Sequence, residues 1–131
     1  MTDTAVRIRR AAAATAGLVA VLYVLTGTGW VAVTAEQEPG LIPPLLIGAV
    51  LYALLAVLLI LRAGRGPLIA GAVLQVPALL LYVAVAAERI PAFEVWGLTI
   101  KALQVALLAA CLALIARTRS SAPRPAGAKL V

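Results

Sequence analysis

The 131-residue sequence contains no histidine, and Cys111 is its only cysteine. Without histidine the chain has no imidazole to bind zinc or to act as the base of a Ser-His arrangement. A single cysteine cannot form a disulfide within the chain, and we interpret Cys111 as a small apolar packing residue. The sequence therefore predicts no catalytic residue, no metal site, no cofactor and no enzyme activity.

Charge is also scarce, since charged residues make up only 12% of the chain and hydrophobic residues 64%. A soluble domain carries about 25% charged residues. A soluble helical bundle would also need a polar face on each helix, and the stretch Leu45–Leu61 contains no charged residue. These proportions exclude a soluble bundle and predict an integral membrane protein.

The apolar residues gather into four runs, and each has roughly the 20 residues that a helix needs to cross a bilayer. The runs are about Ala11–Thr34, Leu41–Leu61, Pro67–Ala87 and Val95–Ala116. Short connections make consecutive helices antiparallel neighbours. We therefore expect an all-α fold, an up-down-up-down four-helix bundle that forms one transmembrane domain over residues 1–116. Residues 117–131 are basic, contain proline and glycine, and are predicted to form a disordered cytoplasmic tail.

The charges between the runs separate by sign. The N-terminus, the second gap and the tail hold all but two of the 11 Lys and Arg residues, while the other gaps hold Glu36, Glu38, Glu88 and Glu94 beside Arg89. Basic segments stay in the cytoplasm, so both termini are predicted to be cytoplasmic. The same bias accounts for the net charge of +6 without nucleic acid. The Ala-, Leu- and Arg-rich composition resembles that of GC-rich bacterial proteins, which favours the bacterial cytoplasmic membrane.

Lys101 is the only charged residue inside a predicted span. It lies roughly 9 Å inside the outer end of the fourth run. An ionisable group at such a depth is costly and marks a candidate functional site. Two structural interpretations stay open beside this one: the ammonium reaches the outer headgroups along its flexible stem, or it pairs with Glu94 on the same helical face.

Other polar residues are predicted at similar depth. Gln75 and Gln104 lie within about 5 Å of each other in depth, and an unsatisfied amide in hydrocarbon is costly, so both are expected to point into the bundle and to bond each other. Pro77 is expected to kink its helix. A polar cavity open to the outer side is one hypothesis, lined by Thr26, Thr28, Tyr82, Lys101 and Gln104. The alternative is that the threonines bond their own helix and Tyr82 anchors at the interface.

Small residues indicate which helical faces pack closely. Ala102, Ala106 and Ala110 recur every four residues in the fourth run. Small side chains let lipid-embedded helices approach each other. The spacing is compatible with packing inside the chain or against a partner helix.

Three classes of function follow from these observations. The first is an accessory or scaffolding subunit that packs against another membrane protein or a second copy. The alternative is a small carrier or channel for an anion or a lipid headgroup at Lys101, with membrane lipids as partners; a membrane enzyme is the third. The chain is similar in size and span number to the small multidrug transporters. They depend on a glutamate in their first span, and Ala11–Thr34 contains no acidic residue, so no family is assigned.

Overall fold

The computed structural model describes residues 3–31, 42–62, 64–88 and 94–120, which form an all-α bundle. Residues 117–120 of the tail predicted at 117–131 are helical rather than disordered, and residues 121–131 and most of the loop residues lie outside the described part. The four helices are each long and apolar enough to cross a membrane. They are α1 (Asp3–Gly27), α2 (Ile42–Leu61), α3 (Gly66–Ala86) and α4 (Val95–Ser120).

The first and last helices differ in extent from the apolar runs. Helix α1 begins at Asp3 rather than Ala11, and α4 continues to Ser120, because the basic segments beside the runs have side chains that suit a helix. Helix α1 also ends at Gly27, well before Thr34. Gly29 follows with a φ of 79°, a left-handed conformation that commonly ends helices and that glycine adopts without strain.

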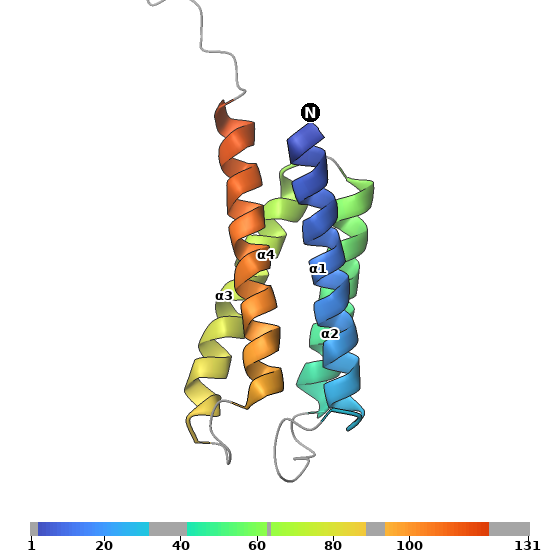
Figure 1. The fold of residues 1–131 in the computed structure, drawn as a ribbon, viewed down its shortest axis with the longest axis vertical. Helices are drawn as coiled ribbons and strands as arrows, with labels where there is room; N and C mark the ends of the chain where they lie inside the picture. Colours follow the sequence, from blue (N-terminus) through green and yellow to red (C-terminus); the bar gives the residue numbers. More distant parts are fainter. Residues whose placement is uncertain (1–2, 32–41, 63, 89–93, 121–131) are drawn as a thin grey trace, which may run out of the picture.

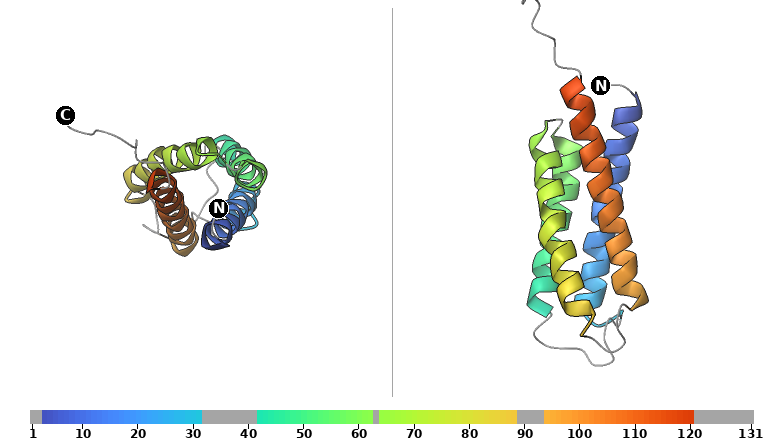
Figure 2. Two further views of the ribbon diagram at one scale, coloured as in Figure 1. Left: turned by 90° about the horizontal axis from the view of Figure 1, so that it is seen from above. Right: turned by 90° about the vertical axis from the view of Figure 1, so that its left-hand side faces the viewer.

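The helices pack side by side as a closed ring in chain order (Figures 1 and 2). Helix α1 packs most extensively against α2, and α4 contacts both α1 and α3. Of the neighbouring pairs in the ring, α2 and α3 touch each other least. The start of α1 and the end of α4 lie at the same end of the bundle (Figure 1).

Two side chains tie the helices together at this end, which we call the basic end. Arg9 is buried on α1, and its Nε donates a 2.7 Å hydrogen bond to the carbonyl of Leu59 in the last turn of α2. Arg65 precedes α3, and its Nε donates a 2.9 Å bond to the hydroxyl of Thr118 on α4. A cation near the end of a helix satisfies a carbonyl and opposes the helix dipole, so Arg9 stabilises the pairing of α1 with α2.

The apolar core is built from small residues of α1 and larger residues of its neighbours. Its fully buried members include Ala16, Val19, Leu59, Leu107 and Cys111. Cys111 thus lies where a packing residue was expected. Ala102 and Ala106, by contrast, are exposed, whereas the half-buried Ala110 packs against the core, so the alanine spacing of α4 does not as a whole mark a helix contact within the chain.

Large apolar side chains cover much of the outside of the helices. Examples are Ile47, Val50, Leu80 and Val83, each more than half exposed. In a lipid-embedded bundle such side chains face acyl chains of matching polarity, so their exposure has no hydrophobic cost there.

Candidate functional site

A network of polar side chains crosses the interior of the bundle. Gln75 on α3 and Gln104 on α4 are both fully buried, which confirms that they point inward. The Tyr52 hydroxyl on α2 joins them, because it donates to Gln75 Oε1 at 2.6 Å and accepts from Gln104 Nε2 at 2.7 Å. The expected direct bond between the two amides is therefore replaced by a bridge through Tyr52.

Gln104 is the centre of this network. Its Nε2 also donates to the Tyr23 hydroxyl on α1 at 2.8 Å, and its Oε1 accepts a 2.6 Å bond from Lys101 Nζ. All four helices thus contribute a side chain. A side-chain amide inside a membrane-embedded bundle must find hydrogen-bond partners within the protein. Both the oxygen and the nitrogen of the Gln104 amide have such partners.

Lys101 turns its ammonium group into the bundle. Besides Gln104, its Nζ donates to the carbonyl of Ala78 at 3.3 Å and to the Tyr23 hydroxyl at 3.4 Å. The same nitrogen lies 5.1 Å from the centre of the Tyr82 ring and 5.8 Å from that of Tyr23. The interpretation in which Lys101 extends to the outer headgroups is therefore wrong for this structure.

The sequence interpretation missed Tyr23 and undervalued Tyr52. Their rings lie 5.6 Å apart and are tilted by 56°. Gly48 makes room for Tyr23, since a Cβ at position 48 would come within 3.1 Å of the ring. A tyrosine in the middle of an apolar run was the available signal, because its hydroxyl needs a partner away from water.

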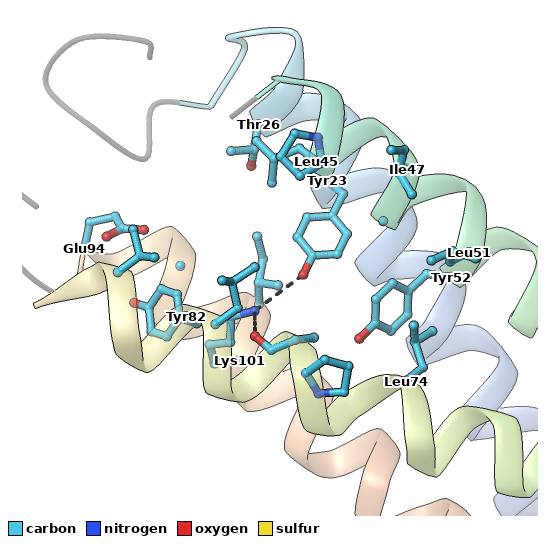
Figure 3. Close-up of a pocket in the computed structure, with 18 residues that line it drawn as sticks. Tyr23, Thr26, Leu45, Ile47, Leu51, Tyr52, Leu74, Tyr82, Glu94 and Lys101 are labelled. Carbon is cyan, nitrogen blue, oxygen red and sulfur yellow. Dashed lines mark hydrogen bonds between the residues drawn. The ribbon is translucent and has the colours of Figure 1, made fainter. Parts of the chain in front are cut away.

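The network borders a cavity of about 440 Å³. The wall is mostly apolar and comes mainly from the facing sides of α2 and α3, the pair of helices that touch least. The polar members of the lining are Tyr23, Thr26, Tyr52, Tyr82, Glu94 and Lys101. Figure 3 shows the Lys101 ammonium between Tyr23 and Tyr82, with Glu94 on the far side of the Tyr82 ring.

The structure divides the predicted site residues into three groups: those that line the cavity, those that support it and one that lies outside it. Thr26, Tyr82 and Lys101 line the cavity, while Gln75 and Gln104 support it from within the network. Thr28 does not belong to the site, because it is exposed and its hydroxyl donates to the Val24 carbonyl of its own helix at 2.8 Å. Pro77 also lines the cavity, and α3 continues through it as one helix.

Glu94 contributes a negative charge that the predicted site lacked. Its carboxylate folds back over Gly97, next to the Tyr82 ring. Both carboxylate oxygens are buried and have no hydrogen-bond partner within the described parts of the chain. The expected pair between Lys101 and Glu94 is thus not formed, although both side chains face the same cavity.

Comparison with known proteins provides no relative for this site. No protein-family model matches the chain, and no curated protein or solved structure does. Within residues 3–31, 42–62, 64–88 and 94–120, no three acidic, Cys or His side chains group as metal ligands would. The candidate site is therefore defined by the cavity, the network and two opposite charges.

Proposed function

We propose that this chain is a small multi-pass protein of the cell membrane, with an up-down-up-down course and both termini in the cytoplasm. Arg9 and Arg65 lie at the basic end of the bundle. Their positive charge supports this orientation, because basic segments are retained in the cytoplasm. The composition favours a bacterial cytoplasmic membrane. The cavity then lies toward the outer leaflet.

We further propose that the cavity binds the headgroup of a lipid-like anion, as the first step of a small carrier. The observation that carries this proposal is the position of Lys101 Nζ in the cavity wall, with two of its hydrogen bonds as long as 3.3 and 3.4 Å. Charge-assisted hydrogen bonds to an anionic oxygen are usually about 2.7–2.9 Å long. An anionic headgroup oxygen can therefore replace the weak bond to Ala78 or Tyr23 with a stronger one.

The shape and polarity of the cavity suit a lipid better than a small hydrophilic anion. Leu51, Leu74 and Leu81 are among the apolar side chains of its wall. A volume of about 440 Å³ falls within the range of ligand pockets. Acyl chains can leave between α2 and α3, where the helices pack least, while the headgroup stays beside Lys101.

The first test is native mass spectrometry of the purified full chain in mild detergent, with added phosphatidylglycerol as the anionic probe. Lys101→Met keeps the length of the side chain and removes the charge, and we expect about tenfold weaker binding. Arg10→Met is the control, since Arg10 is exposed at the basic end. Lys101→Arg should keep most of the affinity, and circular dichroism verifies that each variant is folded. Equal binding by the wild type and Lys101→Met contradicts the proposal.

An accessory role is the second candidate, and one observation favours it. Ala102 and Ala106 are exposed on α4, so a second helix can approach the backbone there. Purification from native membranes, followed by mass measurement of the intact complex, should then yield a stoichiometric partner or a second copy. Replacing both alanines with leucine should dissociate that complex, and a monomer in the wild type contradicts this role.

A further inference from the structure

Two opposite charges face the same cavity on either side of one aromatic ring. Lys101 Nζ lies 5.1 Å from the centre of the Tyr82 ring. The position that a Cβ of Gly97 would take lies 2.9 Å from Tyr82 Cε2, and the Glu94 carboxylate lies still closer to that position. The cation and the anion therefore both lie next to Tyr82 in the wall of one cavity.

Most of the hydrogen-bonding capacity left over among the described residues of the cavity belongs to acceptors, since a carboxylate only accepts and a hydroxyl both accepts and donates. The two Glu94 oxygens are buried and have no partner in the described residues. The same holds for the hydroxyl oxygen of Thr26, a residue that is only 6% exposed. Buried polar atoms without partners are costly, and each such group in a native protein calls for a ligand or water that completes it. The Glu94 carboxylate therefore lacks hydrogen-bond donors.

We infer that the cavity takes a zwitterionic lipid headgroup with a primary ammonium, the chemistry of phosphoethanolamine. The phosphate binds Lys101 and the ammonium binds Glu94, with Thr26 as a further acceptor. This inference rests on the proposed function, since it keeps the anionic end of the ligand at Lys101. It adds a positive charge on the ligand that pairs with Glu94, and this second charge defines the class of lipid.

Two alternatives fit the contacts less well. A purely anionic headgroup, such as phosphatidylglycerol, would leave Glu94 unpaired and place a negative charge near its carboxylate. A trimethylammonium headgroup, such as that of phosphatidylcholine, has the right charge but no N–H group. It cannot donate a hydrogen bond to the Glu94 carboxylate, whereas a primary ammonium has three donors and can serve Glu94 and Thr26 together. The ligand class thus follows from both charge and donor number.

The experiment compares three lipids on the wild type and its variants, each as the full chain in detergent. Native mass spectrometry titrations with phosphatidylethanolamine, phosphatidylglycerol and phosphatidylcholine give the dissociation constants. We expect the wild type to bind phosphatidylethanolamine about tenfold more tightly than either other lipid. Glu94→Gln should remove this preference and leave phosphatidylglycerol binding equal or tighter. Glu88→Gln, at an exposed glutamate beyond the end of α3, is the matched control and should keep the preference.

Thr26→Val provides a second, independent variant, because it keeps the shape of the side chain and removes the hydroxyl. It should weaken phosphatidylethanolamine binding several-fold without changing phosphatidylglycerol binding. Thr28→Val is its control, since the Thr28 hydroxyl bonds its own helix outside the cavity.

The possible outcomes separate this inference from the proposed function. Binding of phosphatidylglycerol that depends on Lys101 but shows no preference for phosphatidylethanolamine overturns the inference and leaves the proposed function standing. A preference that survives in Glu94→Gln, or equal binding of phosphatidylcholine and phosphatidylethanolamine, also overturns it. If Lys101→Met binds all three lipids as the wild type does, both proposals fail.

Discussion

The Tyr52 hydroxyl donates a 2.6 Å hydrogen bond to the Gln75 side-chain oxygen and thereby joins α2 to α3 inside the bundle. The same hydroxyl accepts a bond from Gln104 of α4. Because α2 and α3 touch least among the neighbouring helices of the ring, this polar link stabilises the pairing of the two helices that form most of the cavity wall.

Removal of this hydroxyl should destabilise the bundle. Tyr52→Phe keeps the ring, but it leaves the Gln75 side-chain oxygen without its donor and removes one of the two acceptors of Gln104 Nε2. We expect the free energy of unfolding to fall by about 1–2 kcal/mol. Unfolding in detergent mixtures with increasing dodecyl sulfate, followed by circular dichroism, measures this change. Thr99→Val removes an exposed hydroxyl that bonds its own helix, and it should change stability little. A Tyr52→Phe protein as stable as the wild type contradicts a structural role for the link.

Loss of Gln104 should be more costly than loss of Gln75. Gln104→Leu removes partners from Lys101, Tyr23 and Tyr52, whereas Gln75→Leu removes one from Tyr52 only. The remaining bond of Gln75 goes to the Gly71 carbonyl of its own helix. We expect losses of about 2–3 and about 1 kcal/mol in the same unfolding assay. The reverse order would show that Gln104 is not the centre of the network.

The space beside Gly48 should be essential for the position of Tyr23. In Gly48→Ala the added Cβ would lie 3.1 Å from the Tyr23 ring, so the ring must shift and its hydrogen bonds with Lys101 and Gln104 are disturbed. Overpacking of this kind costs about 1–3 kcal/mol. Gly17→Ala is the matched control, because its Cβ would meet nothing within 4 Å. That variant should be neutral or slightly more stable. Equal thermal stability of the two variants would contradict the close contact.

The basic end offers a test of stability without an effect on the cavity. Arg9→Gln removes the bond to the Leu59 carbonyl and should lower the free energy of unfolding by about 1–2 kcal/mol. Arg10→Gln removes one positive charge from an exposed neighbour of Arg9. It is the control for any effect of the lost charge on membrane orientation. Lipid binding should be unchanged in both. Weaker lipid binding in Arg9→Gln alone would show that the two ends are coupled.

The depth and type of polar residues predicted much of the candidate site. Gln75, Gln104 and Lys101 were identifiable because an amide or a charge inside an apolar run must find a partner within the bundle. Thr28 was not separable from Thr26, since two threonines two residues apart share a depth but face different directions. The rotation of the helix about its axis decides which threonine reaches the cavity. The helix is apolar on all sides, so the periodicity of its sequence does not define this rotation.

The amino-acid sequence by itself determined that the chain forms four apolar helices, because run length and the scarcity of charge are one-dimensional properties. Only the tertiary structure decided that Tyr23 and Tyr52 complete the network and that Glu94 faces the cavity of Lys101. Contacts between residues on different helices depend on the rotation and spacing of each helix. Small residues such as Gly48 determine the rotation and spacing of the helices locally. The pattern of hydrophobic residues along the sequence does not encode either quantity.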